Sequence, residues 1–81
     1  MTYKIGDVLF YKDSRFEIIF KVLPEDQVPC LTTKFPSTTI YGKVVKDING
    51  SWSREYIIVE SVDQKNLAPA TKALKTLYGG V

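Results

Sequence analysis

Residues 38–61 read TTIYGKVVKDINGSWSREYIIVES, and this stretch predicts the hairpin around which the other strands are arranged. Two apolar runs flank Asn49-Gly50, which is the strongest short-range signal for a β-hairpin, because both residues tolerate the positive φ of a type I′ turn. If these two residues form the centre of the turn, the register of the strands follows. It pairs Ile48 with Ser51, Asp47 with Trp52, Val45 with Arg54, Lys43 with Tyr56 and Tyr41 with Ile58.

The two faces of this hairpin differ in chemistry, because successive side chains of a strand point to opposite sides of a sheet. One face is apolar and is predicted to be core; it carries Ile40, Gly42, Val44, Ile57 and Val59. The other face is aromatic and cationic and carries Tyr41, Lys43, Val45, Trp52, Arg54, Tyr56 and Ile58.

The residues before the hairpin predict two further strands. Residues 8–11 read VLFY, and a polar stretch at residues 12–15 fits a hairpin loop. Residues 16–23 then alternate with a period of two, which suits a pleated strand better than a helix. The side chains expected in the core are Phe16, Ile18, Phe20 and Val22, and those expected on the opposite face are Glu17, Ile19, Lys21 and Leu23.

Residues 24–37 break the strand pattern with three prolines and the acidic pair Glu25-Asp26. They predict a loop, or a broken edge strand around Cys30-Leu31-Thr32. A loop this long in a small domain is either functional or a plain irregular connection, and the sequence leaves both interpretations open.

The end of the chain predicts a short helix over residues 69–78. Pro69 suits the first turn of a helix, and Gly79-Gly80 supplies a stop. Such a short helix needs to pack on the sheet or on a partner. Its apolar stripe consists of Ala70, Ala73, Leu74, Leu77 and Tyr78.

Composition limits the class of protein. A chain of 81 residues is expected to form a single domain, and a formal charge of +2 gives no bulk attraction to nucleic acid. The single cysteine, Cys30, has no partner for an internal disulfide. The N-terminus lacks the apolar stretch of a signal peptide, and no segment is long enough to span a bilayer. We therefore expect a cytoplasmic protein that does not enter membranes.

Catalytic chemistry is not indicated. The chain contains no histidine, which removes Ser-His-Asp and Cys-His mechanisms and most zinc sites. Gly42-Lys43 lacks the glycine spacing and the following Ser or Thr of a phosphate loop. We expect no enzyme, no metal, no cofactor and no small-molecule substrate.

The aromatic and cationic face is therefore the functional lead. Its candidate binding residues are Tyr41, Lys43, Trp52, Arg54 and Tyr56. Rings interleaved with cations are typical of single-stranded nucleic-acid binding, and Trp, Tyr and Arg are also enriched at protein–protein hot spots. A third interpretation needs only the fold: the C-terminal helix covers Tyr41, Val45 and Ile58, while Lys43 and Arg54 lie over Tyr56 and Trp52 as cross-strand cation–π pairs.

The order of these elements resembles SH3-like barrels of the KOW and Tudor type. The resemblance covers about residues 4–68, with IGDVLFY at residues 5–11 and YGKVV at residues 41–45 as local matches. It implies a binding module that acts in nucleic-acid or partner recognition. Small solitary domains of this sort also occur among bacteriophage accessory proteins, which bind host factors.

The sequence thus predicts a mostly β domain: a small, SH3-like, partly open antiparallel barrel of about five strands with a short C-terminal helix. The expected function is non-catalytic binding of nucleic acid or a nucleoprotein complex through the five candidate residues. The alternative is a protein-binding adaptor or inhibitor that uses the same face or the outer side of the helix.

Overall fold

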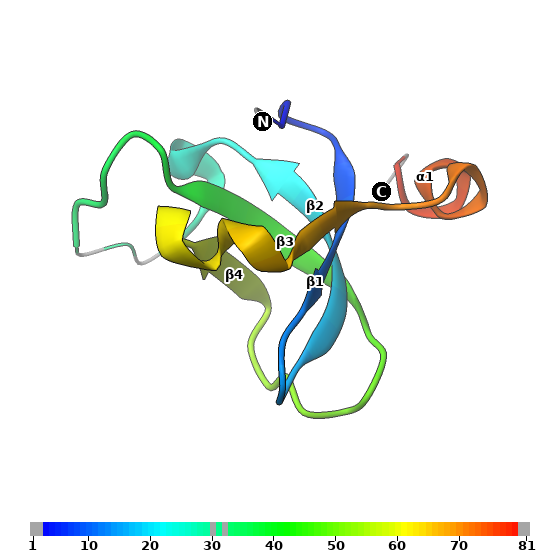
Figure 1. The fold of residues 1–81 in the computed structure, drawn as a ribbon. Coiled ribbons are helices and arrows are strands. Elements are labelled where there is room, and N and C mark those ends of the chain that lie inside the picture. Colours follow the sequence, from blue (N-terminus) through cyan, green and yellow to red (C-terminus); the bar gives the residue numbers. More distant parts are fainter. Residues whose placement is uncertain (1–2, 30, 32, 80–81) are drawn as a thin grey trace.

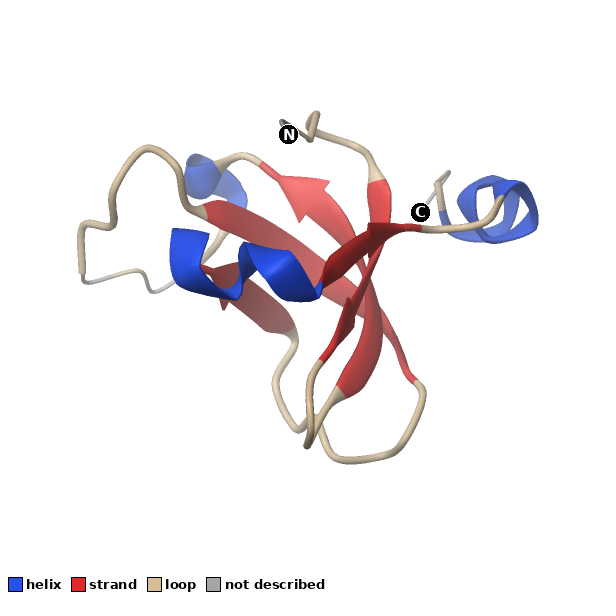
Figure 2. Ribbon diagram, viewed as in Figure 1, coloured by secondary structure: helices blue, strands red, loops and turns tan. Residues whose placement is uncertain are grey.

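The computed structural model describes residues 3–29, 31 and 33–79, so Cys30 and Thr32 of the expected broken strand lie outside the described residues. Within these residues the chain is mostly β, with five antiparallel strands in one open sheet of order β4-β3-β2-β1-β5 and a short C-terminal helix (Figures 1 and 2), which confirms the predicted fold class. The elements are β1 (Val8–Lys12), β2 (Glu17–Leu23), the 3-10 helix η1 (Glu25–Gln27), β3 (Ile40–Asp47), β4 (Tyr56–Val59), the 3-10 helix η2 (Ser61–Asn66), β5 (Leu67–Pro69) and α1 (Lys72–Tyr78).

The register predicted for the hairpin is confirmed along the length of β4. Lys43 of β3 lies opposite Tyr56, and the pairs farther from the turn follow the same register as far as Ile40 and Val59. One further bond of this register joins the N–H of Val44 to the carbonyl of Glu55 at 2.9 Å. The predicted pairs closer to the turn, from Val45–Arg54 to Ile48–Ser51, are not part of the ladder, because β4 begins only at Tyr56. The predicted tight two-residue turn is therefore replaced by a wider loop over residues 48–55.

Hydrogen bonds to Asp47 explain the wider loop. Its carboxylate accepts the backbone N–H of Gly50 at 3.0 Å and of Trp52 at 2.8 Å, while the N–H of Ile48 bonds to Glu17 of β2 at 2.9 Å. A tight hairpin would have paired the Ile48 N–H with Ser51, and the bond to Glu17 takes this donor instead. The Asp47 carboxylate satisfies the N–H groups of the loop that follows. Gly50 still adopts the positive φ, +76°, that glycine favours.

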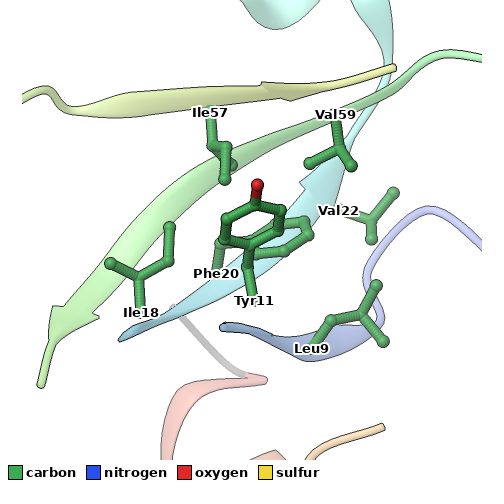
Figure 3. Packing of buried hydrophobic residues seen from close by; sticks show 7 residues of the cluster. All are labelled: Leu9, Tyr11, Ile18, Phe20, Val22, Ile57 and Val59. Atoms are coloured by element: carbon green, nitrogen blue, oxygen red, sulfur yellow. The ribbon is translucent and has the colours of Figure 1, made fainter. Parts of the chain in front are cut away.

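The main core lies on the face of the sheet predicted from the alternation of β2 and β4 (Figure 3). Phe20 and Ile18 are completely buried, and Ile57 and Val59 of β4 pack against them. Phe16, which was also expected in the core, precedes β2 and is half-buried. The full cluster consists of Leu9, Tyr11, Ile18, Phe20, Val22, Ile57 and Val59.

A second, smaller cluster covers part of the opposite face. Ile19, expected on the outer face, is only 3% exposed because Val8 and Ala70 pack beside it. Leu74 and Tyr78 of α1 pack against this cluster, as do Phe10 and Val45. The helix therefore covers the β1–β2 side of the outer face.

The helix is shorter than the predicted one. It begins at Lys72 because Pro69 ends β5 and the hydroxyl of Thr71 caps the helix, accepting the N–H of Leu74 at 3.4 Å. Leu77 of the predicted stripe is 64% exposed, and Ala73 is also exposed. No helix within the described residues has the length and apolar character needed to cross a membrane.

Gly42 leaves the space that Phe20 fills, and we predict that Gly42→Ala destabilises the fold. A methyl group at this position would overlap the Phe20 ring and come within 2.9 Å of the Lys21 carbonyl oxygen. The ring is completely buried, so it cannot swing out into solvent to make space. We expect the free energy of unfolding, measured by urea denaturation, to fall by about 1–3 kcal/mol.

Phe20→Leu supplies the matched background for this test. Leucine lacks the Cε2 atom, and its Cδ atoms belong to no rigid ring and can rotate away from the new methyl group, so Gly42→Ala should cost less in that background than alone. If Gly42→Ala lowered the free energy of unfolding equally in the two backgrounds, contact with the Phe20 ring would not be the cause of the destabilisation.

Candidate functional site

The structure separates the five candidate residues of the hairpin face. Trp52, Arg54 and Tyr56 line one hollow together. Lys43 is exposed, and its ammonium lies 3.8 Å from the carboxylate of Glu55. Tyr41 is buried, with 6% of its surface exposed.

Residues 24–37, and not the C-terminal helix, cover Tyr41. The ring of Phe35 meets the ring of Tyr41 edge to face at 6.4 Å between centroids. Burial raises the pKa of the Tyr41 hydroxyl, and the negative charge of Glu25 adds to the increase. Of the three residues expected beneath the helix, only Val45 packs in its cluster, while Ile58 is 37% exposed.

The hollow is a groove of about 440 Å³, which we call the Trp52 groove. One wall comes from the irregular segment after η1, and the other comes from β4 and the loop before it. Ile58 contributes an exposed apolar side chain next to the rings of Trp52 and Tyr56. Its lining among the described residues is Val28, Pro29, Leu31, Trp52, Arg54, Glu55, Tyr56 and Ile58.

A second hollow of about 350 Å³ shares Trp52 and Arg54 with the groove. Phe16 and the serines on either side of Trp52 complete its lining. Trp52 therefore borders two recesses.

Trp52 is held from the side of the hairpin loop. Its backbone N–H donates to the Asp47 carboxylate, as described above, and its ring meets the ring of Phe16 edge to face at 5.1 Å and 86°. Its indole Nε1 is buried, and no described residue accepts its hydrogen.

A second carboxylate, that of Asp13, holds Phe16 in place. It accepts the backbone N–H of Arg15 at 2.8 Å and of Phe16 at 2.7 Å in the turn between β1 and β2. The Asn49 side-chain amide donates to the Arg15 carbonyl at 3.0 Å and so ties this turn to the hairpin loop. Two aspartate-capped turns thus fix the Phe16–Trp52 ring pair, which makes the ring of Trp52 a preorganised surface.

The charges around the groove are mixed. Arg54 and Glu55 are neighbours on its rim, and Glu55 also meets Lys43. Glu25 and Asp26 border an adjoining hollow that shares Val28 and Leu31 with the groove. The cation–ring contact of this region joins Arg15 to Phe16, at 5.2 Å, in place of the expected contacts of Lys43 and Arg54.

The groove can make apolar contacts and hydrogen bonds. The described residues contain no group of three or more Cys, Asp or Glu side chains placed to hold a metal ion. The groove presents ring faces, branched aliphatic groups, one guanidinium and one carboxylate.

The irregular segment after η1, within residues 24–37, was not predicted to belong to the site. Val28, Pro29 and Leu31 come from a stretch without a strand or helix period, and the prolines marked it only as a possible functional loop. Ile58 lay on the correct face but was not among the candidate residues, although an exposed isoleucine beside aromatic residues was a usable signal.

Comparison of this chain with models of protein families, with curated proteins and with solved structures finds no match. The geometry of the groove is therefore the basis for a functional proposal.

We predict that the turn of Asp13 makes stability depend on acid pH. The backbone N–H groups of Arg15 and Phe16 hold the pKa of the Asp13 carboxyl below its ordinary value of 3.8. Because the folded-state pKa is the lower one, the ionised carboxylate stabilises the fold above about pH 3.8, and this contribution disappears as the pH falls through the folded-state pKa.

Asp13→Asn removes this titration while keeping a side-chain oxygen that can accept hydrogen bonds. Urea unfolding followed by Trp52 fluorescence at a series of pH values should show a smaller loss of stability on acidification in the variant than in the original protein. The same loss in both proteins would contradict a stabilising role for the ionised Asp13.

Proposed function

We propose that this protein is a non-catalytic binding module that holds an extended, largely apolar segment of a partner protein in the Trp52 groove. The observation that carries the proposal is the groove itself: Trp52, Arg54 and Tyr56 face an apolar wall of Val28 and Leu31 across an open hollow. Aromatic and arginine side chains beside an apolar recess are the composition of protein–protein hot spots.

The charges favour a protein segment over nucleic acid. A groove for single-stranded nucleic acid combines stacking rings with a cationic track for the phosphates. Here Lys43 is engaged by Glu55, and Glu25 and Asp26 border the adjoining hollow. Arg54 is the one cation among the described residues that line the groove, so phosphate attraction has little support.

The aromatic residues also favour a protein segment over nucleic acid. Tyr41 is buried, and the Trp52 ring is engaged by Phe16 at one edge. Fewer stacking platforms remain than a run of bases needs, whereas an apolar side chain requires only contact area. Nucleic-acid binding, expected from the sequence, stays a prediction that the experiment below also tests.

The SH3-like resemblance supports the same general class, since it implies a small binding module. Fold analogy alone does not say what such a module binds. An accessory or inhibitory role, such as that of small phage proteins that bind host factors, is consistent with a groove of this kind.

The test begins with a library of random peptides displayed for binding to the immobilised protein. Selected peptides are then titrated against the free protein at low and high salt, with the fluorescence of Trp52, the single tryptophan, as the signal. We expect peptides with alternating apolar residues, Trp52 fluorescence that changes on binding, and affinities that depend weakly on salt.

Two exposed isoleucines provide the variant and its matched control. Ile58→Ser lies in the groove, whereas Ile48→Ser lies in the hairpin loop, and the two side chains are 37% and 42% exposed. Ile58→Ser removes the contact that the isoleucine would make with a bound peptide, so it should weaken peptide binding about tenfold or more. Ile48→Ser should leave binding unchanged.

A parallel titration uses a pool of single- and double-stranded nucleic acid. Binding that falls steeply with salt, together with no peptide that depends on Ile58, would overturn the proposal in favour of a nucleic-acid partner.

A further inference from the structure

The second hollow beside Trp52, which we call the Arg54 hollow, differs in charge from the Trp52 groove. The groove has Glu55 in its lining, whereas no Asp or Glu is among the described residues that line the Arg54 hollow. These residues instead supply one guanidinium, two hydroxyl groups and two aromatic rings; they are Phe16, Ser51, Trp52, Ser53 and Arg54. The hollow therefore presents a positive charge and hydrogen-bond donors to a ligand.

The guanidinium of Arg54 is exposed, and it makes no ion pair or hydrogen bond with another described residue. The carboxylate of the adjacent Glu55 lies 3.8 Å from the ammonium of Lys43. The carboxylate of Asp47 accepts backbone N–H groups of the hairpin loop. These two acidic groups thus have partners of their own, and Arg54 can bind a negative charge that comes from outside the chain.

A second guanidinium lies beside the same pair of rings. The guanidinium of Arg15 is over the Phe16 ring, 5.2 Å from its centroid, and Arg15 is exposed. Asp13 offsets part of this charge, since Arg15 is one of the groups that lower the pKa of the Asp13 carboxyl. Arg54 is therefore the principal cation for a ligand, and Arg15 adds to the attraction.

We propose that the partner segment carries a glutamate or aspartate whose carboxylate binds Arg54 in this hollow. The inference rests on the proposed function, because the groove and the hollow share Trp52 and Arg54, so that a segment lying in the first can continue into the second. A guanidinium can donate two parallel hydrogen bonds to a carboxylate, and serine hydroxyls can donate to the same oxygens. The acidic residue of the segment follows its apolar residues at the end that passes Trp52.

Acidic residues beside the opposite wall of the groove restrict where this carboxylate can bind. The hollow that adjoins the groove at Val28 and Leu31 is bordered by Glu25 and Asp26. A carboxylate is repelled there and attracted at Arg54. Charge complementarity thus selects an acidic side chain and places it on the Trp52 side of the groove.

The test uses the peptides selected for binding to the full chain. We expect them to share a glutamate or aspartate at one fixed end of their apolar positions. One such peptide is synthesised with the acidic residue and with the corresponding amide, glutamine or asparagine, and both forms are titrated by Trp52 fluorescence. The acidic form should bind the original protein about fivefold more tightly than the amide form.

Arg54→Gln removes the positive charge and keeps a polar side chain of similar reach. In this variant the acidic and amide peptides should bind with nearly equal affinity. Lys46→Gln is the matched control, because it removes one positive charge from an exposed residue of β3 that is not among the described lining of either hollow. It should keep the fivefold preference for the acidic peptide.

The outcomes separate this inference from the proposed function. Peptides that depend on Ile58 but show no preference for the acidic form, or a preference that Arg54→Gln leaves intact, would overturn the inference alone. Loss of the preference in Lys46→Gln as well would assign it to the net charge of the protein and would also overturn the inference. If no selected peptide depends on Ile58, the proposed function is wrong and the inference is wrong with it.

Discussion

The close contact between the Phe20 ring and the backbone of Gly42 fixes the register of β2, β3 and β4. Gly42 lies opposite Val22 on one side and opposite Ile57 on the other, so one row across three strands passes beside the fully buried ring. A shift of either strand by one residue would place a larger side chain against that ring and turn the apolar face of the sheet outward. The position of every residue of β4 follows from this row.

The candidate site is built where regular pairing stops. The register of β3 against β2 shifts between Ile19 and Phe20, and beyond Asp47 the chain is held by hydrogen bonds to a side chain in place of a strand partner. A carboxylate at the end of a strand can satisfy several backbone groups and leave the following residues free to project. Trp52 is such a residue, and the facing turn of Asp13 supports it through Phe16.

Alternation was enough to predict β2, the strands of the central hairpin, the pairing of Lys43 with Tyr56 and most of the main core, because a period of two assigns each side chain to a face. It was not enough to predict which parts of the outer face are covered. That depends on residues 24–37 and on a helix that begins after Pro69, and neither has a period that reports its docking position. Tyr41 and Tyr56 share a face and look equivalent in sequence, yet Phe35 lies against only the first in the described structure. The two hollows beside Trp52 likewise arise from segments distant in sequence.

The register set at Gly42 determines which N–H groups of β4 face β3 and which face the open edge. Amide hydrogen exchange of β4, measured residue by residue in dilute solution, tests this assignment. We expect slow exchange at Ile57 and Val59, whose N–H groups bond to β3, and fast exchange at Tyr56 and Ile58, whose N–H groups face the open edge. The opposite pattern, with Tyr56 and Ile58 protected and Ile57 and Val59 exchanging fast, would mean that the strand is shifted by one residue and would contradict both the register and the groove described here.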